Sequence, residues 1–125
     1  MTNLNNFGKN VSIDYFYYKS FLLSLLIVIK MIIENPNNYI HIGFEKSKSK
    51  NKKYDALLKN RENSRIKRVP FGAIGYNQYH DSTGLGLYKS LDTFDKEKRR
   101  LYRIRHKGED KNKYSSGYFS WRFLW

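Results

Sequence analysis

The chain has 125 residues, which is enough for one modest domain. It contains no cysteine, which excludes a disulfide framework and a thiolate zinc site and favours an intracellular protein. The net charge of +13 is uneven: residues 1–44 hold three basic and two acidic side chains, whereas residues 45–125 hold the other 21 basic and 9 acidic side chains, a balance of +12. Such a segment attracts polyanions: nucleic acid, an anionic membrane or an acidic protein surface.

The first predicted element is a hydrophobic helix in the run "YFYYKSFLLSLLIVIKMII", residues 15–33. Within 21–33 only Ser24 and Lys30 are not apolar, so the predicted helix is apolar on every side. The 13 residues of that stretch are fewer than the roughly 20 that a bilayer span needs. This length favours a helix buried in the fold. A membrane anchor is the alternative, since residues 15–18 could extend the run as an interfacial aromatic belt.

The next segments suggest a domain boundary. "ENPNN" at 34–38 breaks the helix, and "YIHIGF" at 39–44 is typical of a short strand. The charged, low-complexity stretch "EKSKSKNKK" predicts a linker over 45–53. We therefore expect an N-terminal segment over 1–44, a linker over 45–53 and a basic domain over 54–125.

Two strands and a glycine corner follow. "KYDALLKN" and "RIKRVPF", separated by "RENS", predict an antiparallel pair that ends near Pro70. The following "FGAIGY" lacks the Gly-Lys-Ser/Thr of a phosphate loop and the spacing of a dinucleotide fingerprint. A Gly-x-x-Gly loop also occurs between two helices of an RNA-binding module, but here it follows a strand. We expect Gly72 and Gly75 to adopt positive φ at a structural corner, with Phe71, Tyr76 and Tyr79 packed against the Leu101 side of the next helix.

That helix is predicted over residues 91–108, with Asp92 or Thr93 as its N-cap and Gly108 at its end. One face is apolar and should pack on the sheet: Phe94, Leu101 and Ile104. The opposite face is basic: Lys96, Arg99, Arg100, Arg103, His106 and Lys107. Only three acidic residues share the segment, so the basic face predicts contact with a polyanion rather than a merely solvated surface.

No motif predicts an enzyme. His41, His80 and His106 lack metal-ligand spacing, and the serines lack the pattern of a nucleophile elbow. We expect no catalysis, no metal and no cofactor. A pocket that joins His80, His106 and an acid would favour an enzyme instead.

The series "KKYDALLKN", "RIKRVPFGAIGYNQYH", "DKEKRRLYRIRHKGED" and "SSGYFSWRFLW" resembles a small uncharacterised family of nucleocytoplasmic large DNA viruses, mimivirus-like and phycodnavirus-like, over about residues 52–125. The resemblance rests on Tyr54, Phe71, Gly72, Ala73, Gly75, Tyr76, Tyr79, Asp95, Lys96, Glu97, Tyr102, Arg105, His106, Gly117, Ser120, Leu124 and Trp125. Residues 81–94 look like an insertion relative to that family. The resemblance implies a viral source, in host cytoplasm or virion, and supplies no activity. It also implies a structural network around the corner and the tail, which we call the motif residues: Phe71, Gly72, Gly75, Tyr76, Tyr79, Tyr102, Arg105, His106 and Trp125.

The sequence thus predicts an α+β fold, with a small antiparallel sheet of two to three strands packed by one amphipathic basic helix and an aromatic C-terminal tail, after an N-terminal hydrophobic helix. The predicted function is that of a non-enzymatic viral accessory or virion protein that contacts nucleic acid. The expected contacts are Lys96, Arg99, Arg100, Arg103 and Lys107 on the helix, with Arg65, Lys67 and Arg68 on the second strand. The alternative is a structural, capsid-associated protein whose partners are other virion proteins or, through residues 15–33, a membrane.

Overall fold

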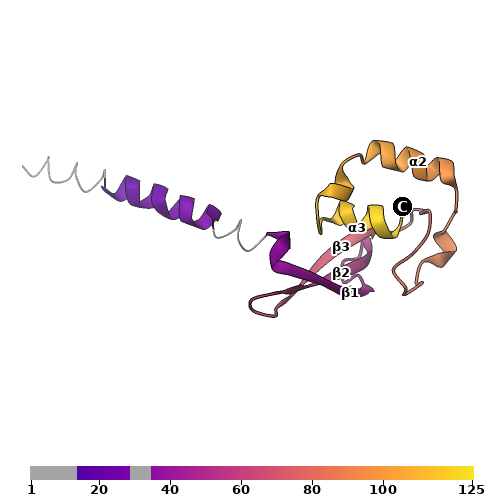
Figure 1. The fold of residues 1–125 in the computed structure, drawn as a ribbon, viewed down its shortest axis with the longest axis horizontal. Helices are drawn as coiled ribbons and strands as arrows, with labels where there is room; N and C mark the ends of the chain where they lie inside the picture. The colour runs from indigo at the N-terminus through magenta and orange to yellow at the C-terminus, as the bar shows by residue number, and fades with distance from the viewer. Residues whose placement is uncertain (1–13, 29–34) are drawn as a thin grey trace, which may run out of the picture. The chain divides into compact units, whose positions relative to one another are not determined.

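The computed structural model describes residues 14–28 and 35–125 (Figure 1). The chain divides after Asn38 into two compact units. In the first unit, residues 14–28 form a helix whose side chains are all exposed. The structure therefore shows neither a protein core nor a bilayer around residues 14–28. Residues 29–33 of the predicted helix lie outside the described residues. Among the described helices, none has the length and apolar character that crossing a membrane requires.

The second unit is built on a three-stranded antiparallel sheet in the order β1-β2-β3. The strands are β1 (Tyr39–Lys46), β2 (Lys52–Asn60) and β3 (Ile66–Ala73). This confirms the α+β class and the strands predicted over these three segments. The register of β1 against β2 shifts between His41 and Gly43.

The charged segment 45–53, expected to be a linker, is instead the β1–β2 hairpin. The buried carboxylate of Asp55 holds its turn, because it accepts hydrogen bonds from Ser47 Oγ at 2.6 Å and from the Lys48 backbone N–H at 3.2 Å. Most of the charged side chains of this hairpin are exposed, with buried Lys53 as an exception, while the backbone is ordered by the contact with Asp55. The division of the chain accordingly falls before β1.

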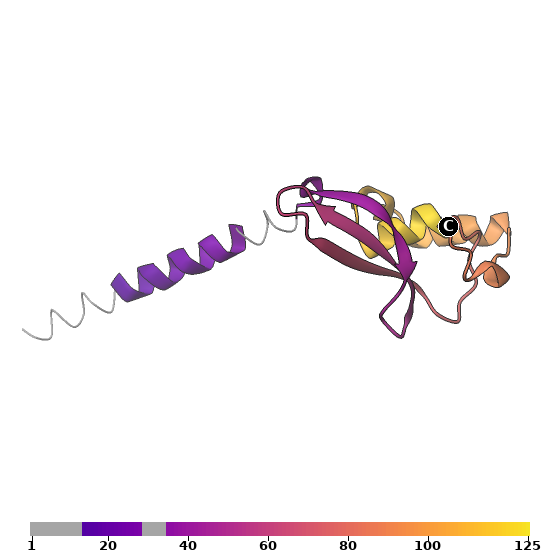
Figure 2. The same cartoon turned by 90° about the horizontal axis from the view of Figure 1, so that it is seen from below.

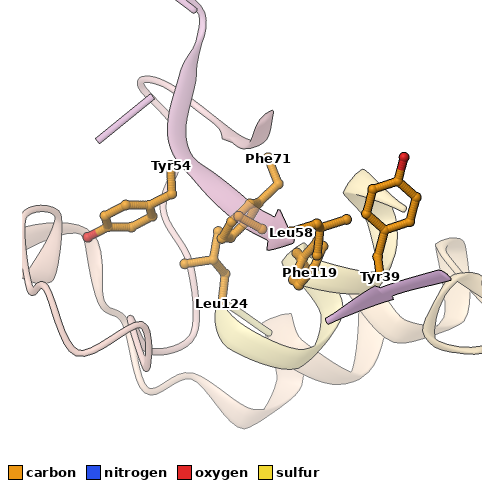
Figure 3. Close-up of a cluster of buried hydrophobic side chains, with 7 residues drawn as sticks. Tyr39, Tyr54, Leu58, Phe71, Phe119 and Leu124 are labelled. Carbon is orange, nitrogen blue, oxygen red and sulfur yellow. The ribbon is translucent and has the colours of Figure 1, made fainter. Parts of the chain in front are cut away.

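The core lies between the sheet and helix α3 (Ser116–Phe123) (Figures 2 and 3). Alternate residues of β2 face it, and Phe71 of β3 and Phe119 of α3 are fully buried there, with ring centroids 5.6 Å apart. Ser115 caps α3 by accepting a hydrogen bond from the Tyr118 N–H. The aromatic tail expected from the sequence is therefore a short helix that covers the sheet. The buried hydrophobic residues are Tyr39, Tyr54, Ala56, Leu58, Phe71, Phe119 and Leu124.

Helix α2 (Lys96–Arg105) differs from the prediction in its start and its packing. Asp95 is the N-cap and accepts hydrogen bonds from the Glu97 and Lys98 N–H groups, because Asp92 is engaged elsewhere. The predicted apolar face does not pack on the sheet: Phe94, Leu101 and Ile104 are 60%, 41% and 58% exposed. In both views α3 is nearer to the sheet than α2 (Figures 1 and 2).

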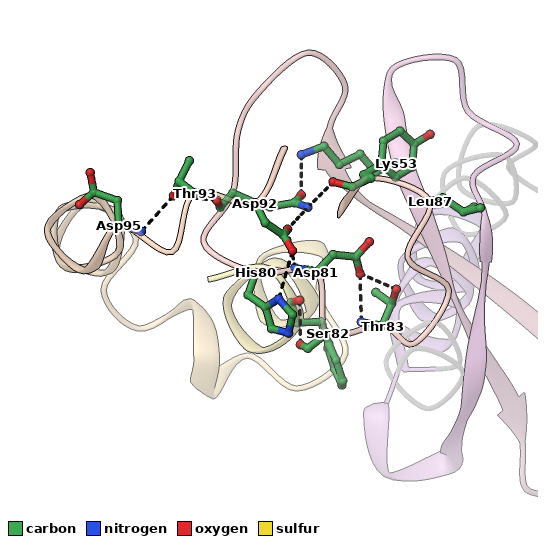
Figure 4. A network of polar contacts seen from close by, with 12 residues as sticks. Lys53, His80, Asp81, Ser82, Thr83, Leu87, Asp92, Thr93 and Asp95 are labelled. Atoms are coloured by element: carbon green, nitrogen blue, oxygen red, sulfur yellow. Dashed lines mark hydrogen bonds and ion pairs between the residues drawn. The ribbon is translucent and has the colours of Figure 1, made fainter. Parts of the chain in front are cut away.

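The loop between the corner and α2 is held by a buried polar network (Figure 4). Gln78 pairs with Asp92 in an isolated bridge, and the backbone N–H groups of Tyr79 and His80 donate to the Leu124 carbonyl at 3.0 and 3.1 Å. Residues 78–80 therefore lie between the start of α2 and the end of α3, and they fix the position of one helix against the other.

Candidate nucleic-acid interface

The glycine corner has the backbone that the sequence predicts: φ is +76° at Gly72 and +84° at Gly75. Its aromatic residues were expected to pack together against α2, but in the structure they lie in three different environments. Phe71 is buried in the core, and Tyr79 is half-buried beneath the Arg99 guanidinium. Tyr76 is 71% exposed. Leu101 offers them no surface because the residues of α2 that face the rest of the fold are Arg99, Tyr102 and His106.

A buried lysine holds the corner in place. The Lys53 ammonium donates hydrogen bonds to the Tyr76 carbonyl at 2.7 Å and to Gln78 Oε1 at 2.8 Å. Burial lowers the pKa of Lys53, and the negative charges of Asp81 and Asp92 partly oppose that effect. Lys53 thereby ties the backbone of the corner to the start of β2.

A second part of the network anchors the same loop from the core side. The hydroxyl of Tyr54 donates a short hydrogen bond to Asp81 and accepts one from the Leu87 N–H at 3.0 Å. Burial, with the hydrogen bond to Asp81 adding to it, raises the pKa of Tyr54 to about 12. Burial works to raise the pKa of Asp81, but hydrogen bonds from Thr83 and Tyr54 outweigh it, and the pKa of this carboxyl lies below its usual value. Asp81 is thus an ionised acceptor inside the loop.

The predicted basic side chains of α2 do share one surface. With Ile104 they line a shallow hollow along the helix, which we call the α2 basic face: Lys96, Arg99, Arg100, Arg103 and Lys107. Arg100 pairs with Glu97 at 2.5 Å. Lys96 and Lys107 make no hydrogen bond or ion pair with any described residue.

Two arginines of this face are held in position. The Arg99 guanidinium lies 4.1 Å from the centroid of the Tyr79 ring, and Arg103 donates a hydrogen bond of 3.0 Å to the Trp125 carbonyl oxygen. Both arginines also line an adjoining hollow of about 190 Å³, together with His80 and Arg122. The sequence does not indicate that Arg122 and His80 belong to this surface, because nothing in the tail shows that the end of α3 lies beside α2.

The basic residues predicted on the strand that the structure shows as β3 are not part of this surface. Arg65, Lys67 and Arg68 line neither hollow. Arg68 instead pairs with Asp55 at 2.9 Å and with Glu45 at 2.6 Å. Its guanidinium is therefore paired with two acids of the other two strands.

Six of the nine motif residues line a further cavity of about 490 Å³. They are Gly72, Tyr76, Tyr102, Arg105, His106 and Trp125. Tyr102 lies between two rings, with centroid distances of 4.2 Å to His106 and 4.5 Å to Trp125. Burial raises the pKa of Tyr102 to about 12, and the charge of Glu109 adds to this effect. The cavity is thus formed where the corner, α2 and α3 meet.

The histidines occupy separate places. His80 Nδ1 lies 3.1 Å from Asp92 Oδ2, and His106 Nδ1 lies 3.1 Å from Glu109 Oε1, but the two rings line different hollows. The pocket that would favour an enzyme, with both histidines and an acid, is therefore not formed by these residues. Among residues 14–28 and 35–125, no group of three or more His, Asp or Glu side chains could hold a metal ion.

Comparison with known proteins gives one similarity. A family of unknown function (DUF5754) matches residues 42–83, which run from β1 through β2, β3 and the glycine corner to Thr83. No curated protein and no solved structure matches the chain. The similarity covers the sheet and the corner and ends before α2, so it supplies no activity for the α2 basic face.

Proposed function

We propose that this protein binds nucleic acid through the α2 basic face and catalyses no reaction. The observation that carries the proposal is the convergence of five Lys and Arg side chains, four on α2 and Lys107 just after its end, on one hollow, continued by Arg122 in the next. Phosphates spaced along a strand match a row of cations spaced along a helix, and the release of their counterions favours binding.

The contacts that hold Arg99 and Arg103 support the same proposal. Each guanidinium rests on an aromatic ring, Tyr79 for Arg99 and Trp121 for Arg103, at 4.1 and 5.3 Å from the centroid. A side chain that is already ordered loses less conformational entropy when it binds a phosphate. Lys96, Arg100 and Lys107 are exposed and would add charge at the outer side of the hollow.

The biological setting of the proposal comes from the resemblance described above. A small basic protein of a large DNA virus would meet nucleic acid in the host cytoplasm or in the virion. Such a protein would act as an accessory or virion component.

The test is fluorescence anisotropy of labelled oligonucleotides with the full chain at several salt concentrations. The triple variant Lys96→Gln, Arg100→Gln and Lys107→Gln should weaken binding and lower the slope of log K against log [salt] by about two, since each lost contact removes about 0.7 to 0.9. The matched control is Lys48→Gln, Lys50→Gln and Lys59→Gln, which removes three exposed charges from the β1–β2 turn and from β2. An equal loss in both variants, or no salt-sensitive binding by the unmodified protein, contradicts the proposal.

A second candidate is a structural protein that binds other virion proteins or a membrane. It is favoured by exposed aliphatic side chains on one face of the sheet, where Lys59 pairs with Ile40 on one side and Ile66 on the other. The exposed apolar helix over 14–28 adds to it. The aromatic C-terminal tail does not add to it, because α3 packs on the sheet. Retention on nuclease-treated virion shells would support this candidate, and loss with the genome would contradict it.

A further inference from the structure

The 490 Å³ cavity has the size of a small-molecule site and three separate walls. One is the glycine corner with Tyr76 and Asn77, the second is the end of α2 with Arg105, and the third is the end of α3 with Trp125. The corner approaches closely because Gly72 has no side chain: a Cβ there would lie 2.8 Å from Leu124 Cδ1. The backbone geometry of the corner is thus matched to the packing behind the cavity.

Two tyrosines line this cavity, and they differ in exposure. The ring of Tyr102 is not available to a ligand, because His106 and Trp125 stack on it. Tyr76 is 71% exposed, and its ring contacts no aromatic ring or cation of the described residues. The two hydrogen bonds of Lys53 fix the backbone beneath it, since one ends on the Tyr76 carbonyl itself. An exposed ring on a fixed backbone is a stacking platform for a planar group.

The charged groups around the cavity are cations. Lys52 and Arg105 line it, and neither side chain forms an ion pair within the described part of the chain. Glu109, the acid that contacts the cavity-lining His106, is engaged by that histidine. A neutral apolar ligand would form no ion pair with these cations. A ligand that combines a planar ring with a phosphate can stack on Tyr76 and form ion pairs with Lys52 and Arg105.

The cavity also adjoins the basic hollows. Trp125 and Leu124 line both this cavity and the hollow that contains Arg99 and Arg103. A strand whose phosphates lie on the α2 basic face can therefore place a base on the other side of Trp125. Bases in a duplex are stacked and paired, so only an unpaired base can enter.

From these observations we propose that the cavity binds an unpaired nucleobase of a single-stranded nucleic acid, with the base stacked on Tyr76 and its phosphate held by Lys52 and Arg105. This inference rests on the proposed function, because the α2 basic face supplies the neighbouring phosphate contacts. It adds a class of ligand, because it predicts that the protein prefers single-stranded nucleic acid to duplexes.

The experiment compares three ligands of equal length on the full chain: a pyrimidine single strand, the same strand with consecutive abasic sites, and a duplex. Single-stranded DNA and RNA arms show which sugar is preferred. The unmodified protein should bind the intact single strand about tenfold or more tightly than the abasic strand. Tyr76→Ala should remove that difference and leave duplex binding unchanged, and Tyr76→Phe should keep it because the ring remains. Tyr76 is exposed, so neither variant should disturb folding.

The outcomes separate this inference from the proposed function. Equal binding of intact and abasic strands, or an unchanged preference in Tyr76→Ala, overturns the base site while salt-sensitive binding through the α2 basic face can still stand. Absence of binding to all three ligands overturns the α2 basic face and, with it, the base site.

Discussion

Lys53 and Gln78 are both buried, and the Lys53 ammonium donates a hydrogen bond of 2.8 Å to Gln78 Oε1. The amide nitrogen of Gln78 donates in turn to the Tyr88 carbonyl at 3.0 Å and to Asp92 Oδ1 at 2.8 Å. This amide therefore connects the start of β2 to the loop that precedes α2. A buried ammonium with so few acceptors depends on each of them, since an unpaired buried charge is costly.

The first prediction concerns that pair. Gln78→Leu should lower the free energy of unfolding by about 2–3 kcal/mol, because the Lys53 ammonium loses an acceptor in the interior. The double variant Lys53→Met with Gln78→Leu should recover part of the loss by removing the charge as well. Urea denaturation followed by circular dichroism measures both. A double variant whose loss equals the sum of the single losses would show that the two side chains are not coupled.

The second prediction distinguishes the two helices. Phe119→Ala on α3 should cost about 3–5 kcal/mol of unfolding free energy, because a fully buried ring is lost from the core. Leu101→Ala on α2 should cost about 0.5 kcal/mol or less, since that side chain is 41% exposed. Thermal unfolding of both variants provides the comparison. Comparable losses would mean that α2 packs on the core as the sequence predicts.

The third prediction compares the two corner glycines. Alanine at either position should cost about 1–2 kcal/mol, because both residues have positive φ. Gly72→Ala should cost about 1–3 kcal/mol more, since its Cβ would meet Leu124, whereas a Cβ at Gly75 meets nothing within 4 Å. Chemical denaturation of the two variants tests this difference. Equal losses of unfolding free energy in the two variants would mean that a Cβ at Gly72 does not approach Leu124 as closely as 2.8 Å.

The parts of the fold that the sequence predicts depend on local pattern. Tyr54, Ala56 and Leu58 alternate along β2 and face the core, and positive φ at Gly72 and Gly75 follows from glycines placed after a strand. The hairpin at 45–53 could not be recognised, because its order comes from Asp55, whose carboxylate binds a turn seven and eight residues earlier. An ordered polar turn and a flexible linker can have the same amino-acid composition, so composition does not distinguish them.

The candidate site was predictable only within one helix. The spacing of Lys96, Arg100 and Arg103 places them on one side of α2 whichever way the helix packs. The inward face could not be predicted, because Tyr102 packs between His106 and Trp125, and the sequence does not show that Trp125 lies there. For the same reason Arg68 could not be separated from the α2 arginines, since its partners Glu45 and Asp55 are on other strands.

The fourth prediction uses the carboxylate of Asp55. Burial works to raise its pKa, but hydrogen bonds from Ser47, from Arg68 and from the Lys48 N–H outweigh burial, so its pKa in the folded protein lies below the usual 3.8. The unfolded state therefore binds the proton more readily than the folded state between these two values. The stability contributed by Asp55 is complete above pH 3.8 and is lost as the pH falls through the folded pKa.

Asp55→Asn removes this titration, so the variant should be less stable than the unmodified protein by about 1–2 kcal/mol at pH 7, since charge-assisted hydrogen bonds become neutral ones. The difference between the two proteins should shrink as the pH is lowered below 3.8, because the unfolded chain then takes up a proton at Asp55 that the folded protein binds only at lower pH. Urea denaturation of both proteins between pH 7 and pH 3 gives the difference at each pH. Arg68→Met, which leaves the carboxylate in place but removes its guanidinium partner, should lie between them at pH 7. A difference that stays constant over this range would mean that Asp55 is not held ionised by the hairpin and Arg68.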